Sequence, residues 1–237
     1  MKFKILIFFI LLSILSKSQS IDSTWVEKNL ISKYTTDTIT FLPAVTFTSD
    51  KGKSLILSDF KGKILYVSLW STSCAPCIAQ FPHQEQLFNR LEKNHLDTSV
   101  IFININMQDT KTEWKKALTK YHPIGINLHS SDTSFYDKWG INTIPCHILI
   151  SRSGYLLGKY ILQPSDGGID WLLYATVKGI NPIEAIWREF SQNKLMEKNK
   201  SSLVFTDKEF DKWFKDFLPS LLEYNSWKKI HQTFNNR

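Results

Sequence analysis

Two apolar segments of seven residues constrain the fold more than any other feature of the sequence. Ile64–Trp70 and Val100–Asn106 are mostly hydrophobic, which is typical of strands buried on both faces of a sheet. Between them, apolar residues recur at helical spacing over Cys77–Lys93. The order strand, helix, strand predicts a parallel pair of strands joined by a right-handed crossover.

Two hairpins are predicted on either side of this unit. Residues 44–48 and 55–57 flank a turn and predict one hairpin, and residues 147–157 predict another. A further helix is predicted over residues 110–120. Hairpins added to a parallel pair give the expected fold class, which is α/β with a mixed central sheet flanked by helices.

The distribution of glycine predicts the domain organisation. All nine glycines lie between Gly52 and Gly179, so a turn-rich body is expected to end near residue 180. We therefore expect an export signal at residues 1–20, a lead-in at 21–39, a body at 40–180 and a helical C-terminal extension at 181–237.

Helix signals support this view of the extension. Asn181-Pro-Ile-Glu184 and Thr206-Asp-Lys-Glu209 both carry N-terminal capping patterns, and a kink or break is expected at Pro219. An apolar stripe follows the second pattern and consists of Phe210, Trp213, Phe214, Phe217, Leu221 and Tyr224. Such a stripe either packs on the body as core or offers a docking face to a partner protein.

The N-terminus has the three-part pattern of a secretory signal peptide. Met1–Lys4 is basic, Ile5–Leu15 is apolar, and Ser16–Ser20 is polar with small residues. The apolar run would span only about 16 Å of a hydrocarbon core of about 30 Å. We expect cleavage after Ser20 and an exported mature form that does not span a membrane, periplasmic if the source is Gram-negative. No cysteine precedes Cys74, so a lipid-modified cysteine at the cleavage site is excluded.

The net charge of +7 does not indicate nucleic-acid binding. Lys2, Lys4 and Lys17 lie in the predicted signal peptide, and the other charges are mixed in sign along the chain. A hydrophobic content of 43% excludes disorder of the whole chain. Three cysteines are too few for a disulfide-stapled scaffold or a four-cysteine zinc site.

The cysteine pair carries the predicted chemistry. Cys74 and Cys77 enclose Ala75-Pro76 between the first apolar strand and the helix that follows, a spacing that allows a disulfide around one helical turn. Cys74 is expected at the helix start, where a thiolate is stabilised, and Pro76 suits the first turn. Cys74 would attack a substrate disulfide and Cys77 would resolve the mixed disulfide.

Two other interpretations of the pair remain open. It could be half of a zinc site, for which Cys146-His147 is the only pair that could supply further ligands. It could also be a structural disulfide, although so small a loop constrains the unfolded chain little. The remaining histidines lack ligand-like spacing and are expected on the surface or in loops: His83, His95, His122, His129 and His231.

The residues around the pair resemble the thioredoxin superfamily. The resemblance covers about residues 40–178 and is carried by Trp70-Ser-Thr-Ser-Cys-Ala-Pro-Cys77, by Pro82 and by Ile144-Pro145 before a strand. The Gly52 hairpin, Gly62-Lys63 and Arg152-Ser-Gly154 narrow it to secreted or membrane-tethered thiol-disulfide oxidoreductases of the TlpA and ResA type.

This resemblance implies roles for individual residues. Cys74 would be the nucleophile and Cys77 the resolving cysteine, while a cis Pro145 and the backbone of Ile144 would form the edge that binds a substrate peptide. Trp70 and Trp114 would shape the surroundings. The resemblance also implies a redox-active Cys74-Cys77 disulfide in place of a cofactor, protein thiol or disulfide substrates, and a membrane-bound electron donor.

Several positions depart from the family pattern. Ser68 stands where cytosolic thioredoxins have a buried aspartate, Ala75 where some relatives have a glutamate, and Ser73 where a tryptophan is frequent. The motif therefore offers no base for Cys77, which leaves water or a distant acid such as Glu85.

Cys146 is the largest departure, because the family usually has threonine after the cis proline. As a small, partly apolar residue it would fill space in the core. Alternatively, it is a third thiol close enough to Cys77 to trap or relay the disulfide.

The sequence as a whole predicts an exported thioredoxin-fold thiol-disulfide oxidoreductase with an N-terminal hairpin and a helical C-terminal extension. The uncharged Ala75-Pro76 pair favours a reductant over a strong oxidant. One alternative is a non-catalytic binding or assembly protein that uses its aromatic helical tail. The other is a metal-thiol chaperone that uses Cys74, Cys77, Cys146 and His147.

Overall fold

The computed structural model describes residues 41–130, 132–198 and 205–235, without the side chains of 194–198 and 225–235. The chain divides into two compact units, residues 1–38 and 39–237, and the described residues belong to the second. The predicted signal peptide and lead-in, residues 1–39, lie outside them. None of the helices in these described ranges has both the length and the apolar character needed to cross a membrane.

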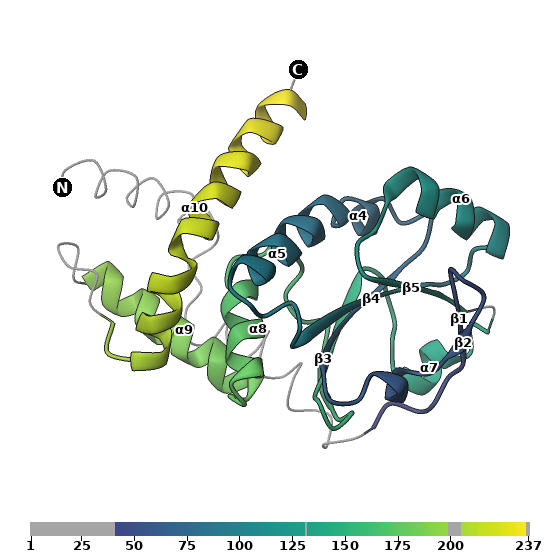
Figure 1. Ribbon diagram of the computed structural model, residues 1–237, viewed down its shortest axis with the longest axis horizontal. Coiled ribbons are helices and arrows are strands. Elements are labelled where there is room, and N and C mark those ends of the chain that lie inside the picture. Colours follow the sequence, from purple (N-terminus) through teal and green to yellow (C-terminus); the bar gives the residue numbers. More distant parts are fainter. Residues whose placement is uncertain (1–40, 131, 199–204, 236–237) are drawn as a thin grey trace. The chain divides into compact units, whose positions relative to one another are not determined.

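A mixed sheet of seven strands forms the centre of the body (Figure 1). The strands are β1 (Phe47–Ser49), β2 (Ser54–Leu55), β3 (Ile64–Trp70), β4 (Val100–Asn106), β5 (Ile126–His129), β6 (Cys146–Ile150) and β7 (Leu156–Lys159). Their spatial order is β2-β1-β5-β4-β3-β6-β7. The β3, β4 and β5 strands are parallel to one another, and the remaining pairs are antiparallel. The predicted α/β class with flanking hairpins is confirmed.

The two strands predicted to be central have the predicted bounds. They pair in parallel from Ile64 opposite Val100 to Trp70 opposite Asn106, and every residue of β3 is buried. Since β6 pairs with the other side of β3, the chain that leaves β3 toward the cysteine motif starts from the middle of the sheet.

Helices cover both faces of this sheet. They are α4 (Ala75–Ile78), α5 (Phe81–Lys93), α6 (Lys111–Tyr121), α7 (Phe135–Trp139), α8 (Ile169–Val177), α9 (Pro182–Lys198) and α10 (Lys208–Asn235), and a 3₁₀ turn spans Leu57–Phe60. In Figure 1, α5 and α6 lie on one side of the sheet and α7 on the other.

The single helix predicted over Cys77–Lys93 is wrong. The chain forms two helices, α4 and α5, which are separated at Ala79-Gln80. Pro82 explains the break, because proline has no N–H to continue a helix and is tolerated in the first turn of a new one, where it stands in α5.

Three elements were not predicted. The β5 strand and α7 are short, and α8 is buried on nearly all sides, so it lacks the periodicity that marks an amphipathic helix. The β5 strand also corrects one expectation about histidine, since His129 is a buried strand residue and not a surface or loop residue.

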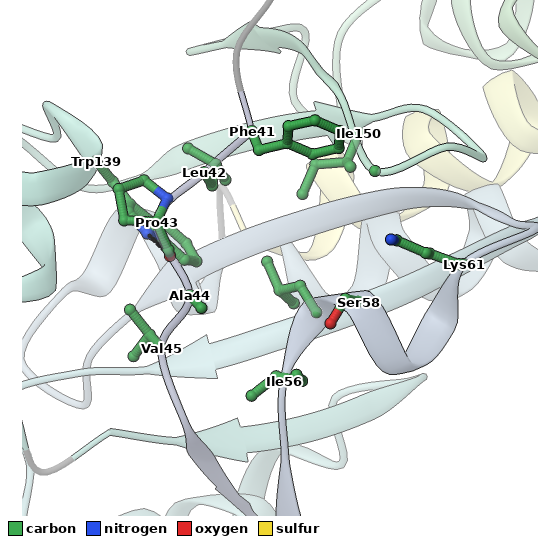
Figure 2. Close-up of a pocket in the computed structure, with 12 residues that line it drawn as sticks. Phe41, Leu42, Pro43, Ala44, Val45, Ile56, Ser58, Lys61, Trp139 and Ile150 are labelled. Carbon is green, nitrogen blue, oxygen red and sulfur yellow. Dashed lines mark hydrogen bonds between the residues drawn. The ribbon is translucent and has the colours of Figure 1, made fainter.

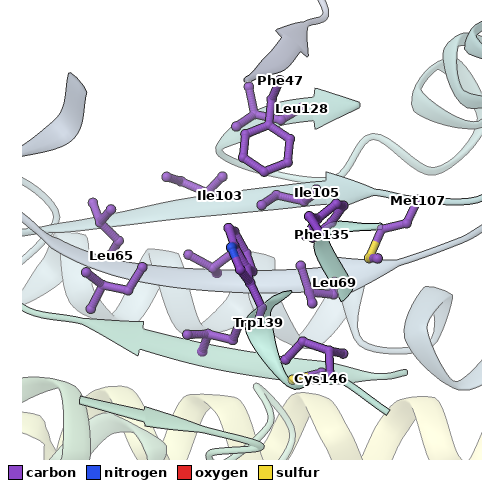
Figure 3. Packing of buried hydrophobic residues seen from close by; sticks show 14 residues of the cluster. Phe47, Leu65, Leu69, Ile103, Ile105, Met107, Leu128, Phe135, Trp139 and Cys146 are labelled. Carbon is purple, nitrogen blue, oxygen red and sulfur yellow. The ribbon is translucent and has the colours of Figure 1, made fainter. Parts of the chain in front are cut away.

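The side chains of β3 alternate between two hydrophobic layers. Leu65, Val67 and Leu69 belong to the larger layer, which includes Phe135 and Trp139 of α7 (Figure 3). The intervening residues Tyr66, Ser68 and Trp70 therefore point to the opposite face, where Tyr66 contacts Phe102 and Trp70 contacts Phe81. This alternation decides which side chains can meet at the cysteine pair.

The extension is helical, as predicted. Asn181 Oδ1 accepts a hydrogen bond from the Ile183 N–H at 2.9 Å at the start of α9. At the start of α10 the capping oxygen comes from Asp207, which accepts from the Phe210 N–H at 2.9 Å, and not from Thr206. The helix continues through Pro219 without the expected break.

The apolar stripe of α10 is part of the core. Phe210, Trp213, Phe217 and Tyr224 are buried. The Phe210 and Trp213 rings lie 5.0 and 5.5 Å from that of Trp171 in α8. The stripe is therefore core, and it is not the docking face that the alternative interpretation requires.

A buried ion pair joins three helices at this junction. Arg90 of α5 donates from Nε and Nη2 to the two carboxylate oxygens of Asp170 in α8, at 2.8 and 2.9 Å. The Arg90 guanidinium also lies 4.0 Å from the ring centroid of Tyr224 in α10. The extension is thus attached to the helix that follows the cysteine motif.

Candidate active site

The two cysteines form a disulfide in which one cysteine is more exposed than the other. Cys74 and Cys77 are bonded, with Cα atoms 5.3 Å apart. Cys74 is the N-cap of α4, and the Cys77 N–H donates to Cys74 O at 3.0 Å and to Cys74 Sγ at 3.3 Å. Cys74 is 9% exposed and Cys77 is 3% exposed. This order of exposure is the one expected of a nucleophile and its resolving partner.

Aromatic residues enclose the pair. The redox cluster, as we call it, consists of Trp70, Cys74, Cys77, Phe81, Trp114 and Ala117. The half-buried residues Ile78, Leu118, Tyr121 and Ile144 pack against it. Both tryptophans expected near the pair are therefore members of this cluster, and α6 contributes Trp114 and Ala117 to it.

The Ile144–Pro145 peptide bond is cis, as the resemblance implied. Ile144 packs against the redox cluster, so the structure brings this residue of the predicted docking edge to the cysteines. Ala75 and Pro76 form the first turn of α4.

Ser68 has a hydrogen-bond partner that the sequence did not predict. Its Oγ lies 3.0 Å from Nδ1 of His147 on the neighbouring strand β6. Burial lowers the pKa of His147 to about 3, so this imidazole is neutral at physiological pH and adds no charged proton acceptor. Its place opposite Ser68 in the register becomes visible only after the strands are paired.

Cys146 lies in the other hydrophobic layer. It is fully buried beside Leu69 and Ile148, whereas the cysteine pair packs with Trp70 on the opposite face. Burial raises the pKa of the Cys146 thiol to about 11. The third-thiol hypothesis is therefore not supported, because neighbouring residues of a strand point to opposite faces.

The same alternation weakens the zinc and metal-chaperone interpretations. Cys146 and His147 point to opposite faces of β6 and cannot both turn toward the cysteine pair. Across the described parts of the chain, no group of three or more His, Cys, Asp or Glu side chains is arranged to hold a metal ion.

Asp109 is a second residue near the cysteine pair that the sequence did not predict. Its carboxylate accepts hydrogen bonds from Thr72, two residues before Cys74, and from Asn106 at the end of β4. One feature of the sequence could have indicated it. Asp109 lies between the second apolar strand and the capping box Thr110 to Glu113, at which α6 begins.

A cavity of about 190 Å³ lies away from the redox cluster (Figure 2). Its lining is mostly apolar and comes from residues 41–45, 56–58, Lys61, Trp139, Ile150 and Gly154. It shares no residue with the redox cluster and contains no predicted site residue.

Known proteins are similar in sequence to this chain. Residues 38–168 match the Redoxin family. The chain is 24% identical over 122 residues to the thiol-disulfide oxidoreductase ResA of a Bacillus cereus strain, covering 50% of this chain and 66% of that protein. It is 26% identical over 110 residues to ResA of Halalkalibacterium halodurans, covering 45% and 58%. The chain therefore matches less than two thirds of the length of these curated relatives.

A solved structure supports the same assignment. The thioredoxin domain of a thiol-disulfide oxidoreductase from Bacteroides vulgatus is 25% identical, with a TM-score of 0.50, and the match covers 60% of this chain and 96% of that domain. Together with the cysteine pair and the cis proline, the family match over more than half of the chain leads to one conclusion: this protein belongs to the Redoxin family, within the thioredoxin superfamily.

Proposed function

We propose that this protein is an exported thiol-disulfide oxidoreductase that reduces disulfides in protein substrates. The observation that carries the proposal is the Cys74–Cys77 disulfide at the start of α4, with Cys74 the more exposed residue, in a chain of the Redoxin family. Relatives named thiol-disulfide oxidoreductases support it.

The reaction transfers two electrons and two protons from the cysteine pair to the substrate. Cys74 thiolate attacks one sulfur of the substrate disulfide, which forms a mixed disulfide and releases the first substrate thiol after protonation. Cys77, as thiolate, then attacks Cys74 Sγ, which forms the Cys74–Cys77 disulfide and releases the second substrate thiol. A dithiol electron donor returns the pair to its reduced state, and we expect that donor to be membrane-bound.

The surroundings of the pair favour a reductant. A strong oxidant needs a strongly stabilised thiolate, and Ala75-Pro76 supplies no positive charge. The α4 helix has only four residues, so few peptide dipoles act on Cys74. We therefore expect a potential near that of thioredoxin, about −270 mV, and far from the value of about −120 mV of a strong oxidant.

Substrate peptides would bind along the edge formed by Ile144 and Pro145. Ile144 is half-buried against the redox cluster, so an extended peptide placed on its backbone would carry a disulfide toward Cys74. No resident cofactor is needed, because the cysteine pair itself stores the electrons.

Insulin reduction by the full chain tests the proposal. The wild-type protein should accelerate insulin reduction over the rate with dithiothreitol alone, and Cys74→Ser should abolish this acceleration. Reduced Cys77→Ser, mixed with insulin in the absence of dithiothreitol, should accumulate a mixed disulfide detectable by mass spectrometry. Cys146→Ala is the matched control and should act like the wild type. Acceleration of insulin reduction that survives Cys74→Ser would refute the proposal. A separate measurement, fractionation of the source cells, tests export.

A further inference from the structure

Asp109 connects the loop before Cys74 to two strands of the sheet. Its Oδ2 accepts from the Thr72 N–H at 2.7 Å and from Asn106 Nδ2 at 2.6 Å, and its Oδ1 accepts from Thr72 Oγ1 at 2.5 Å. Its carbonyl oxygen accepts from His129 Nε2 on β5 at 2.8 Å. One residue thus fixes the loop relative to β4 and β5.

The loop has few other means of holding its shape. Ser71 O accepts from the Cys74 N–H at 3.1 Å, and the Ser71 and Ser73 hydroxyls lie 3.0 Å apart. Both interactions are internal to the loop and do not tie it to the sheet. The Thr72–Asp109 pair does so, from a position only two residues before Cys74.

The Asp109 carboxylate also places a negative charge close to the redox pair. Only Ser73 separates Thr72 from Cys74, so the carboxylate lies within about 10 Å of the Cys74 backbone. In the described part of the chain, no lysine or arginine forms a salt bridge with it. At this distance, a charge changes the equilibrium between thiol and thiolate about two- to tenfold at effective dielectric constants between those of a protein surface and water.

We infer that Asp109 is a positioning residue of the redox site, which holds the Cys74 loop through Thr72 and whose charge keeps the cysteine pair reducing. This inference rests on the proposed function and deepens it. The charge disfavours the Cys74 thiolate and hence the reduced form, and a less stable reduced form is a stronger reductant.

An isosteric substitution separates the charge from the hydrogen bonds. In Asp109→Asn the side-chain oxygen can still accept from the Thr72 N–H and Asn106, while the new amide can donate to Thr72 Oγ1, whose hydroxyl rotates. The charge acts on the thiolate and not on the neutral thiol, so the equilibrium with glutathione is measured at a pH high enough for the reduced Cys74 to be a thiolate. Under that condition the equilibrium constant of the full chain should shift about two- to tenfold toward the dithiol form, with insulin reduction retained. Glu113→Gln is the matched control, because Glu113 bonds Thr110 and not the loop. Its shift should stay below about twofold, since its carboxylate is exposed.

Two variants test the positioning part. Thr72→Val removes one hydrogen bond and keeps the charge, so it should slow insulin reduction and leave the glutathione equilibrium unchanged. Asp109→Ala should show both effects. An equilibrium constant for Asp109→Asn equal to that of Glu113→Gln, or insulin reduction by Asp109→Ala at the wild-type rate, would overturn the inference. Failure of the wild type to reduce insulin would contradict the proposed function, whereas the effect of the Asp109 charge is still decided by the glutathione equilibrium, which requires no protein substrate.

Discussion

Single residues take their roles here from the face of the sheet on which they lie. Cys146 and His147 are adjacent in sequence, yet Cys146 packs with Leu69 whereas His147 forms a hydrogen bond with Ser68. The Cys146 thiol is therefore a core group, separated by the sheet from the cysteine pair that it resembles chemically.

Replacement of Cys146 tests this assignment. Cys146→Ala should leave insulin reduction and the glutathione equilibrium unchanged, because the thiol takes no part in exchange. It should lower the free energy of unfolding by about 1 kcal/mol through the small cavity that it leaves. Urea unfolding and the insulin assay measure the two effects. Loss of exchange activity in a folded variant would restore the third-thiol hypothesis.

Glu189 makes stability depend on pH. Its carboxylate lies against Gly168 at the start of α8, and burial, with a smaller effect of Asp170, raises its pKa to about 7. An unfolded glutamate titrates near pH 4.3, so the folded state holds the proton more tightly. The stabilising effect of that proton is complete below about pH 4 and is lost as the pH rises through 7.

Glu189 by itself should decrease the free energy of unfolding by about 2 kcal/mol between pH 5 and pH 8. His147, whose pKa burial lowers to about 3, acts in the opposite direction by a similar amount, because the unfolded imidazole takes up a proton near pH 6.5. Urea unfolding at both pH values therefore measures the contribution of Glu189 as the difference between the wild type and Glu189→Gln, whose amide does not titrate. Glu184→Gln, an exposed position on the same helix, should keep the pH dependence of the wild type. Equal pH dependence in wild type and Glu189→Gln would rule out this origin.

Among the secondary-structure elements, the junction of α5, α8 and α10 depends on one ion pair. Arg90 and Asp170 are both about 95% buried, and Tyr224 covers the guanidinium. A charge that loses its partner in such a place is strongly destabilising, more so than the pair is stabilising.

Removal of one partner should therefore cost more than removal of both. Arg90→Met should lower the free energy of unfolding by about 3–5 kcal/mol, and adding Asp170→Asn should recover part of that loss. Lys93→Met is the control, since its ion pair with Glu223 is exposed and should contribute less than about 1 kcal/mol. Urea unfolding of the four proteins decides the matter. A double variant as unstable as Arg90→Met would argue against an unpaired Asp170 as the cause.

At the scale of the whole molecule, the body and the extension share a core. Trp171 of α8 is fully buried, its ring lies against Phe210 and Trp213 of α10, and its Nε1 donates to Ala185 O of α9 at 2.7 Å. The sequence boundary at residue 180 thus separates two compositions, while the apolar core continues across it.

We expect the body and the extension to unfold together. Because the stripe of α10 covers α8, peptides from β3 and from α10 should lose hydrogen-exchange protection at the same urea concentration. Hydrogen exchange followed by mass spectrometry across a urea series measures this. Loss of protection in α10 at a lower urea concentration, with β3 still protected, would show that the extension is an independent domain.

Local sequence patterns determined much of this protein. The two apolar seven-residue segments gave the bounds of the central strands, apolar spacing placed α6, and the capping pattern at Asn181 placed α9. The spacing of Cys74 and Cys77 indicated the disulfide. Each of these depends on residues close together in the chain, so a single sequence is sufficient to find them.

The tertiary structure decided the features that depend on strand pairing and helix packing. Strand register decides which side of the sheet Cys146 and His147 face. The contact of Thr72 with Asp109 and the packing of α10 on α8 likewise join residues that are far apart in the chain. The buried environment then sets the neutral state of His147 and the inert thiol of Cys146. Desolvation depends on neighbours in space, and a sequence alone does not list those neighbours.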